Sequence, residues 1–249
     1  MRVDEVIIMN NFIWDELKFF LTRLKSLRVS ECMNLNHESF CVSTGTYSEN
    51  WIYCPNPESV KVNDAVNFFR ERDISFMWPV CDSESLRHTD LIYAGDLTAM
   101  FLESKQESNR VPESNPDITI MKINSREHSA LWAKTAWHSF GGEYDDVPEN
   151  YYAFIDALTE DENLSLYLAF HDDKPSGTFL TTIMGGVYYF GVIPEMRRKG
   201  VARAMMNEIC RHNTRVVLQS TPSGYAFYKS YGFAELFRMP VYSTEADIF

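Results

Sequence analysis

The sequence predicts an α/β protein whose sheet has mixed strand direction, and three observations carry this prediction. Stretches of alternating apolar residues are interleaved with stretches whose apolar residues recur every three or four positions, as in strands and amphipathic helices. Gly185-Gly186 separates two apolar stretches, which is typical of a β-hairpin and therefore of antiparallel pairing. The 249 residues are 45% hydrophobic and 23% charged, which is ordinary for one large or two small globular domains.

Residues 1–104 are predicted to form a first domain. Leu17, Phe20, Leu21 and Leu24 recur at helical spacing, so a helix is expected around them. Short apolar stretches bounded by polar turns predict strands in the same half. In order, the expected elements are a helix at 12–28, strands at 40–42 and 51–53, a helix at 62–72, a strand at 75–80 and a helix at 83–93.

Residues 105–117 are almost entirely polar or proline, which predicts a linker or a long surface loop. Residues 118–249 are predicted to form a second domain. In it, Thr221 and Pro222 are of types favoured at a helix start, and Gly232 is favoured just after a helix end. In order, the expected elements are a strand at 117–123, a helix opened by Ser125, a helix at 151–158, strands at 164–170, 179–184 and 187–193, a helix at 201–212, a strand at 216–219, a helix at 222–231, and strands at 233–237 and 239–242.

Composition narrows the classes of partner. The formal net charge of −12 argues against nucleic acid, because phosphate neutralisation needs a basic surface, and it is compatible with a cationic substrate such as an amine. No stretch approaches the roughly 18 apolar residues of a membrane-spanning helix, and the first residues lack a signal-peptide pattern. The five cysteines form no Cys-x-x-Cys pair, which favours free thiols in a reducing cytoplasm over a metal cluster or a disulfide framework. We therefore expect a cytoplasmic protein without a metal or a membrane partner, and the sequence leaves its oligomeric state open.

Four residues before the predicted helix at 201–212 carry the most information about function. Arg197, Arg198 and Lys199 place three cations at a helix start, followed by Gly200. A helix start already carries partial positive charge and unpaired N–H groups, so cations there are unfavourable unless a polyanion binds. A pyrophosphate is the usual polyanion, and the alternative is a solvated basic patch. A glycine at 200 would let such a ligand approach the backbone.

The same segment resembles a motif of the GCN5-related N-acetyltransferases (GNAT proteins). Arg197, Gly200 and Ala202 stand in the positions of their Arg/Gln-x-x-Gly-x-Gly/Ala motif, and Val192 and Pro194 match the residues that precede it. The predicted strand, turn and helix around the motif also agree with this family. The motif alone is short, so a second matching block is needed to support the resemblance.

That second block is 218–233, which ends in Tyr228-x-x-x-Gly232-Phe233 and is similar to another conserved block of the family. Together the two blocks extend the resemblance over about residues 118–242. It implies a GNAT fold for 118–249, with acetyl-CoA as the co-substrate and an amine as the acceptor.

The resemblance also implies which residues hold the donor. The pyrophosphate would be bound by backbone amides of the turn and helix start, and the pantetheine arm would pair with the strand that precedes them. The implied donor-binding residues are Gly191, Val192, Ile193, Arg197, Arg198, Lys199, Gly200, Val201, Ala202 and Thr221. A glycine within a strand fits this interpretation, because it often marks a bulge or the close approach of a ligand or another backbone. A backbone N–H near Val192 would stabilise the oxyanion.

Tyr228 is the catalytic residue that the resemblance implies. It would protonate the departing CoA thiolate after direct attack of a neutral amine on the thioester, which requires a donor within hydrogen-bond reach of the sulfur. The alternative interpretation of Tyr228 is a core aromatic on a helix. The alternative for the whole protein is a non-catalytic CoA-binding or sensor module, which would not need this tyrosine.

The acceptor side is less defined. Glu143 and Asp145 lie in an acidic segment between two predicted helices, which borders the acceptor pocket in this family. They could select a cation or act as a base, and a solvated acidic loop is an equal alternative. His138 is interpreted as structural, and Glu195 as a partner of Arg198. Neither the acceptor nor the general base follows from the sequence.

The order of elements in the first half resembles a second, degenerate acetyltransferase unit. The segment 93–96, Tyr-Ala-Gly-Asp, falls where Gly-Phe would be expected. No Arg-x-x-Gly-x-Ala counterpart is present, so this half has no evident means of holding a pyrophosphate. Its expected role is structural, or to help wall the acceptor site.

Overall fold

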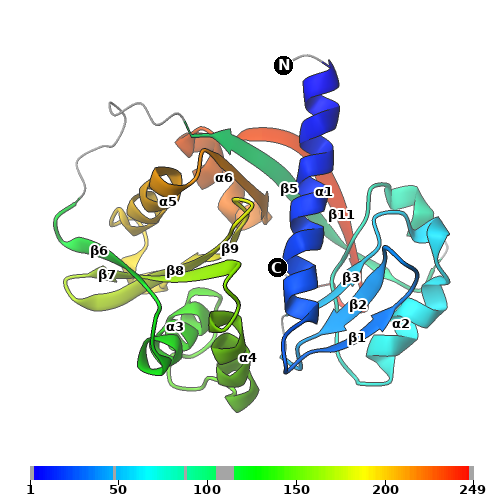
Figure 1. The fold of residues 1–249 in the computed structure, drawn as a ribbon, viewed down its shortest axis with the longest axis horizontal. Coiled ribbons are helices and arrows are strands. Elements are labelled where there is room, and N and C mark those ends of the chain that lie inside the picture. Colours follow the sequence, from blue (N-terminus) through cyan, green and yellow to red (C-terminus); the bar gives the residue numbers. More distant parts are fainter. Residues whose placement is uncertain (1–2, 47–48, 87–88, 105–114, 247–249) are drawn as a thin grey trace. The chain divides into compact units, whose positions relative to one another are not determined.

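The computed structural model describes residues 3–46, 49–86, 89–104 and 115–246. The chain forms two compact units, each described by itself (Figure 1). The continuous unit is Leu102–Leu218, and the discontinuous unit combines Met1–Phe101 with Gln219–Phe249. Most of the predicted linker, residues 105–114, lies outside the described residues. The units group 219–249 with the first half of the chain, whereas the sequence grouped them with 118–218; the predicted domain boundaries stay a prediction.

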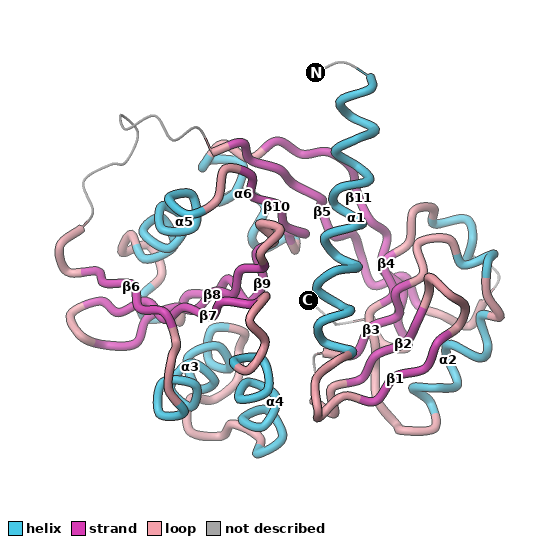
Figure 2. Tube along the Cα trace, in the orientation of Figure 1, coloured by secondary structure: helices cyan, strands magenta, loops and turns pink. Residues whose placement is uncertain are grey.

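The continuous unit is built on an antiparallel sheet in the order β6-β7-β8-β9. These strands are Ile118–Lys122 (β6), Leu164–His171 (β7), Lys174–Thr182 (β8) and Val187–Val192 (β9). Helices α3 (Arg126–Ser139) and α4 (Glu149–Thr159) cover one face of the sheet, and α5 (Val201–His212) covers the other (Figure 1). The predicted hairpin is confirmed: β8 and β9 are adjacent and antiparallel on either side of Gly185-Gly186 (Figure 2).

The core of this unit follows from its sequence periodicities. Leu164, Leu166 and Leu168 alternate with more exposed residues along β7 and point into the core, as the two-residue period of a strand requires. On α5 the buried residues include Val201, Met205 and Ile209, which form the apolar stripe that an amphipathic helix turns towards a sheet. Trp132 and Phe154 are fully buried between α3, α4 and the sheet.

The discontinuous unit begins with the long helix α1 (Val3–Lys25), followed by an antiparallel sheet in the order β1-β2-β3. A second sheet places β11 (Ala234–Ser243) between β5 (Ile92–Glu103) and β4 (Trp78–Pro79), antiparallel to both. The remaining elements are β1 (Glu31–Asn34), β2 (Phe40–Ser43), β3 (Asn50–Tyr53), α2 (Val62–Arg70), α6 (Pro222–Tyr231) and the short 3-10 helices η1 (Pro57–Ser59) and η2 (Ser83–Leu86). The strands β5 and β10 (Arg215–Ser220) each contain residues of both units.

Several elements differ from the sequence predictions. The helix predicted at 83–93 is wrong: among the described residues of this range only the short η2 is helical, and Ile92 opens a twelve-residue strand, β5. The centre of β5 is buried, and its partner β11 comes from far along the chain, so no local pattern identifies it. The two strands predicted at 233–237 and 239–242 are one strand, β11, with a bulge between Glu235 and Phe237. β1 was not predicted, because most of its residues are exposed.

The termini of α6 agree with the prediction in position. Gly232 caps its end with a φ of +119°, a conformation that glycine adopts without strain. Thr221 occupies the N-cap, but its side chain makes no capping hydrogen bond; its hydroxyl bonds the hydroxyl of Ser223 at 2.9 Å instead.

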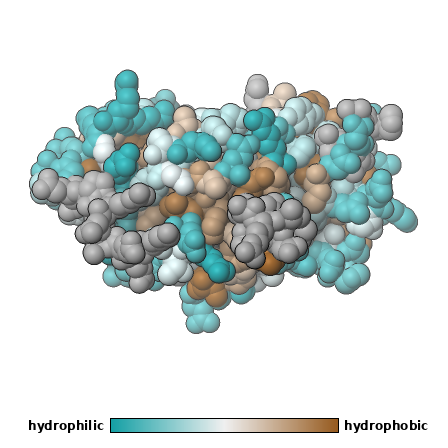
Figure 3. All heavy atoms as spheres, turned by 90° about the horizontal axis from the view of Figure 1, so that it is seen from above, coloured by the Kyte–Doolittle hydropathy of each residue, from teal (hydrophilic) through white to brown (hydrophobic). Residues whose placement is uncertain are grey.

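The surface mixes hydrophilic and hydrophobic residues on the face drawn in Figure 3. The large hydrophobic side chains that are exposed include Ile8, Phe140 and Ile183. Among the residues that the structure describes, no helix is both long enough and apolar enough to cross a membrane.

Candidate functional site

The strand β9 contains a bulge just before the predicted pyrophosphate turn. Two residues of β9, Tyr189 and Phe190, stand opposite the single Phe179 of β8, between the pairs Thr178↔Gly191 and Leu180↔Tyr188. Tyr189 has a φ of +50°, which is uncommon for a residue with a side chain. A bulge leaves one residue of the strand outside the ladder and re-aims its neighbours, so bulges recur beside functional sites.

The strained backbone at Tyr189 is held by packing against α3 and α4 and by a hydrogen bond from β8. The ring of Tyr189 contacts Trp132 of α3 edge-on, with centroids 5.5 Å apart, and lies 6.4 Å from the ring of Phe154 of α4. The hydroxyl of Thr178 donates a hydrogen bond to the Tyr189 carbonyl at 3.1 Å. The surrounding core therefore fixes a conformation that the residue type alone would not select.

β9 separates from β10 soon after it starts. The described residues of the continuous unit show one isolated parallel bridge between these strands, Gly186↔Val217, where the Val217 N–H donates to the Gly185 carbonyl at 3.0 Å. Among the described strands of this sheet, β9 lies at the edge, beside β8. Its other edge therefore presents main-chain donors and acceptors to which an extended ligand can pair like an added strand.

The end of β9 leads into a turn with two left-handed residues. A short 3-10 helix, η3 (Pro194–Met196), is followed by Arg198 with a φ of +64° and Gly200 with a φ of +89°. Gly200 is exposed, and a Cβ there would meet nothing closer than Ile118 at 3.7 Å, so its conformation rather than crowding explains the glycine. Gly200 is the N-cap of α5 and no side chain caps this helix start. A helix start of this kind suits an anion, and the binding of a pyrophosphate there stays a prediction.

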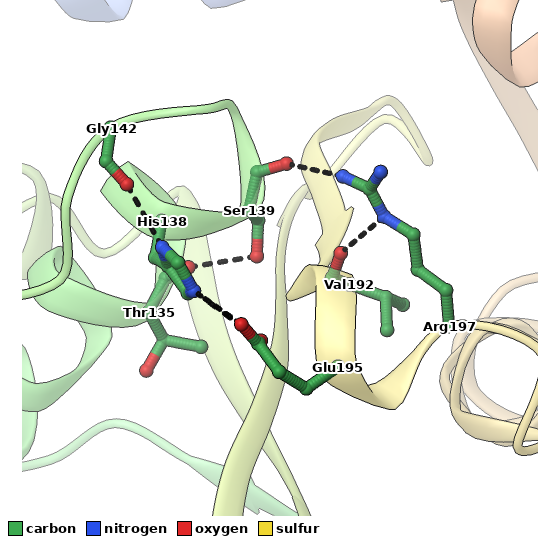
Figure 4. Close-up of polar contacts among 7 residues, drawn as sticks. All are labelled: Thr135, His138, Ser139, Gly142, Val192, Glu195 and Arg197. Atoms are coloured by element: carbon green, nitrogen blue, oxygen red, sulfur yellow. Dashed lines mark hydrogen bonds and ion pairs between the residues drawn. The ribbon is translucent and has the colours of Figure 1, made fainter.

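Arg197 braces this turn through its side chain (Figure 4). Its Nε donates to the Val192 carbonyl at 3.1 Å, and its Nη2 donates to the Ser139 carbonyl at 3.2 Å. The guanidinium therefore joins the end of β9 to the end of α3 by charge-assisted hydrogen bonds. Because the Arg197 side chain makes these two hydrogen bonds, the predicted contact of Arg197 with a pyrophosphate falls to its backbone N–H, and it stays a prediction.

Gly191 is explained by the close approach of α3. A Cβ at this position would lie 2.7 Å from the Ser139 Cβ and 3.3 Å from the ring of Phe140. The sequence alone offered a bulge, another backbone or a ligand as reasons for a glycine here, and the structure shows the close approach of side chains at the end of α3. Its part in binding a donor stays a prediction.

Gly191→Ala is expected to destabilise the protein by roughly 1–3 kcal/mol, because the added methyl overpacks a contact that has no free volume. Denaturant unfolding of the purified variant measures this loss. Ser139→Gly removes the opposing Cβ. In a chain that carries Ser139→Gly, the further change Gly191→Ala should therefore cost less stability than it does in the wild type. If the two substitutions prove additive, the contact between Gly191 and Ser139 does not limit the packing.

His138, at the end of α3, contacts both the following loop and η3 (Figure 4). Its Nδ1 lies 2.9 Å from the Gly142 carbonyl, and its Nε2 lies 3.3 Å from each carboxylate oxygen of Glu195. The bond to Gly142, followed by that to Glu195, raises the pKa of His138. A backbone N–H and His138 lower the pKa of Glu195. The sequence-based interpretation paired Glu195 with Arg198; the partner in the structure is His138.

The predicted acceptor residues lie in the loop between α3 and α4. Asp145 forms an ion pair with Lys134 at 2.9 Å, which raises the pKa of that lysine, and the ammonium also lies 5.4 Å from the ring centre of Tyr144. Glu143 is exposed. The structure thus gives Asp145 a local partner, and the proposed selection of a cation by these two residues stays a prediction.

Tyr228 lies on α6, in the discontinuous unit, whereas the turn and β9 lie in the continuous unit. Its side chain is buried, and this burial raises the pKa of its phenol. Its ring packs edge-on against Phe233 at 5.5 Å and covers Gly224, where a Cβ would lie 2.9 Å from the ring. Its carbonyl accepts hydrogen bonds from the N–H groups of Gly232 and Phe233. Part of the Tyr-x-x-x-Gly-Phe pattern is therefore a helix cap.

Three features of the site were not identified from the sequence. They are the left-handed Tyr189, the bond from Arg197 to the Ser139 carbonyl, and the contact of His138 with Glu195. Each depends on α3 lying against β9 and η3, and no residue pattern along the chain reports that contact. Among the described residues, no group of three or more His, Cys, Asp or Glu side chains could hold a metal ion.

The comparisons with known proteins agree with this geometry. Residues 162–235 match the family model described as an acetyltransferase (GNAT) domain, which spans β7, β8, β9, the turn, α5, β10 and α6. No curated protein sequence matches the chain significantly.

Solved structures of low sequence identity share the fold. A GCN5-related N-acetyltransferase from Kribbella flavida aligns over 92% of this chain and 94% of its own, with a TM-score of 0.62 and 14% identity. A second, from Sphaerobacter thermophilus, aligns over 74% of this chain and 66% of its own, with a TM-score of 0.55 and 16% identity. A tandem GNAT protein from the clavulanic acid biosynthesis pathway aligns over 89% of this chain and 85% of its own, with a TM-score of 0.54 and 10% identity.

The family match agrees with the observed geometry, in which a bulged strand leads into a helix without a side-chain cap. The fold predicted for 118–249 is confirmed, and the structural likeness extends over most of the chain. Residues 162–235 are similar to the GNAT acetyltransferase domain, and the chain has the GNAT fold.

Proposed function

We propose that this protein is an acetyl-CoA-dependent N-acetyltransferase that acts on a primary amine. One observation carries the proposal furthest: β9, the edge strand of its sheet, runs directly into a turn whose following helix, α5, starts without a side-chain cap. A strand edge suits an extended amide-containing arm, and a helix start suits a pyrophosphate. CoA carries these two groups in this order.

The donor is proposed to bind to this continuous surface. The pantetheine arm pairs with β9, and the pyrophosphate accepts hydrogen bonds from the N–H groups of the turn and the first turn of α5. The exposed side chains of Arg198 and Lys199 add positive charge beside it. The proposed donor residues are Gly191, Val192, Ile193, Arg197, Arg198, Lys199, Gly200, Val201, Ala202 and, from α6, Thr221.

In the proposed reaction a neutral amine attacks the thioester carbonyl. A main-chain N–H near Val192 stabilises the oxyanion, and Tyr228 protonates the sulfur as the C–S bond breaks. Burial raises the pKa of Tyr228, so the phenol is protonated at neutral pH, as a proton donor must be. Glu143 is proposed to favour a cationic acceptor, with Asp145 held beside it by Lys134.

Free cysteines support the proposed cytoplasmic location. The five cysteines, all within the described residues, are thiols outside any disulfide, and Cys41 and Cys54 are buried. Burial raises the pKa of the Cys41 thiol to about 12, so it stays protonated and unreactive.

Release of free thiol tests the function. The protein is incubated with acetyl-CoA and a panel of amines, including a small polyamine, an aminoglycoside, an amino acid and a lysine peptide. At least one amine is expected to accelerate thiol release above the rate with acetyl-CoA alone. Binding of acetyl-CoA in calorimetry without thiol release with any amine would instead support the non-catalytic CoA-binding module.

A further inference from the structure

The protonation state of His138 follows from its two partners. A neutral imidazole has one N–H donor and one acceptor nitrogen. The Gly142 carbonyl and the Glu195 carboxylate are both acceptors, and each faces a different ring nitrogen of His138. Both contacts are favourable only if both nitrogens carry a proton. The geometry therefore assigns His138 as an imidazolium, without reference to its titration.

The bridge that this imidazolium makes joins two parts of the site. On one side is Gly142, whose N–H donates to the Trp137 carbonyl at 3.0 Å and whose Cα lies against the Trp137 indole, so the loop after α3 is fixed at this residue. On the other side is Glu195 of η3, two residues before Arg197. We call the contact of His138 with Gly142 and Glu195 the His138 bridge.

The His138 bridge lies beside a second link between the same elements. Arg197 donates a hydrogen bond to the carbonyl of Ser139, the residue after His138. The end of α3 is therefore joined at two adjacent positions to residues 194–200, which lead into α5 and which we call the donor turn. The two links differ in one respect. The guanidinium of Arg197 stays charged at every physiological pH, whereas an imidazole titrates near neutrality.

The charges around His138 decide the sign of the effect. Glu195 is negative and stands at the entrance to a turn that is proposed to bind an anion, so its charge alone would oppose that ligand. The imidazolium compensates this charge and holds η3 in place. Glu143 from the loop adds a second negative charge near His138, and Tyr144 places its ring edge-on at 5.9 Å. Lys134, one turn earlier in α3, is engaged with Asp145.

We propose that His138 and Glu195 are positioning residues for the donor turn, and that the protonated His138 bridge strengthens donor binding and couples it to the loop that borders the acceptor. This inference rests on the proposed function. The contribution of the His138 bridge to donor affinity is present while His138 is charged. It is lost as the pH rises through the pKa of His138 in the folded protein. The raised pKa of His138 and the lowered pKa of Glu195 widen the window in which both groups are ionised.

The test compares the binding of dephospho-CoA across pH in matched variants. This ligand retains the pyrophosphate but lacks the 3′-phosphate, whose own titration would confuse the profile. Calorimetry is carried out between about pH 5.5 and 8.5, which brackets the range in which histidine titrates. The affinity of the wild type for dephospho-CoA is expected to fall by about two- to fivefold as the pH rises. A change of this size corresponds to the contribution of a partly exposed ion pair.

Two variants separate the His138 bridge from a general effect of histidine. His138→Gln should bind as weakly at low pH as the wild type does at high pH, with a flat profile. His212→Gln is the matched control, because His212 also pairs with a glutamate, Glu208 at 3.0 Å, but at the other end of α5. This control should follow the wild-type profile. A role confined to folding would lower the melting temperature of His138→Gln and leave its pH profile like that of the wild type.

A direct titration completes the experiment. In proton NMR, the ring signal of His138 is identified by its loss in His138→Gln, and its pKa should fall in Glu195→Gln. A wild-type affinity that does not change with pH, or a His138→Gln profile that matches the wild type, overturns the inference and leaves the proposed function intact. If the wild type binds neither dephospho-CoA nor acetyl-CoA at any pH, both this inference and the proposed function are overturned.

Discussion

Tyr228→Phe is expected to lower kcat for acetyl transfer by about 10²- to 10⁴-fold, the range typical of a removed general acid. The Kd for acetyl-CoA should stay within about twofold of the wild-type value. The reason is that the phenylalanine ring keeps the packing against Phe233 and Gly224, while the proton donor is lost. Thiol release under saturating substrates gives kcat, and calorimetry gives the Kd.

A neighbouring tyrosine provides the control for Tyr228→Phe. Tyr231 lies on the same helix, its ring 6.3 Å from Phe233, so Tyr231→Phe makes the same chemical change nearby. It should leave kcat within about threefold of the wild type. If Tyr228→Phe retains the wild-type kcat with a rate-limiting chemical step, Tyr228 is a packing residue and another group protonates the thiolate.

Ala202→Glu is expected to weaken the binding of acetyl-CoA by about tenfold or more without destabilising the fold. Ala202 is in the first turn of α5, where a carboxylate interacts favourably with the helix dipole and with free N–H groups. The same carboxylate would occupy and repel the position proposed for the pyrophosphate. A loss in binding that is accompanied by equal or higher stability is a combination that general damage to the protein does not produce.

The isosteric Ala202→Gln separates charge from size in this experiment. It should bind acetyl-CoA several-fold more tightly than Ala202→Glu, and the difference should shrink at high salt, because screening weakens the repulsion. Calorimetry and thermal unfolding are run on the same samples. Equal affinities for the two variants would place the pyrophosphate away from the start of α5.

Local signals in the sequence predicted much of the fold. Gly185-Gly186 identified the β8–β9 hairpin, and the spacing of Val201, Met205 and Ile209 identified α5, because these patterns depend on residues close in the chain. Gly200 was singled out as a point where a ligand could approach the backbone; the structure adds that it is a left-handed residue before a helix, a conformation that favours glycine. Predictions failed where pairing is distant: the helix predicted at 83–93 extends over the first two residues of β5, and the rest of β5, whose partner β11 is far along the chain, was not predicted.

The site was predicted in part for the same reason. The turn and helix start are consecutive residues, so a motif could mark them. The contacts of His138 with Glu195 and of Arg197 with Ser139 join residues more than fifty positions apart, and they arise only once α3 lies against β9. The strain at Tyr189 is set by the rings of Trp132 and Phe154, and no residue type at 189 announces it.

The pairing of β5 with β11 has a consequence for how the chain is made. Ala234 pairs with Phe101, and the continuous unit lies between them in the sequence. A ribosome therefore delivers all of Leu102–Leu218 before the strand that completes the earlier sheet has been synthesised. The continuous unit has every strand of its own antiparallel sheet close in sequence, so it can fold during translation, whereas β5 must wait for a distant partner. Until its two neighbours in the sheet, β10 and β11, emerge, β5 has a hydrophobic centre and no partner strand, and the nascent chain is most prone to aggregate during this interval.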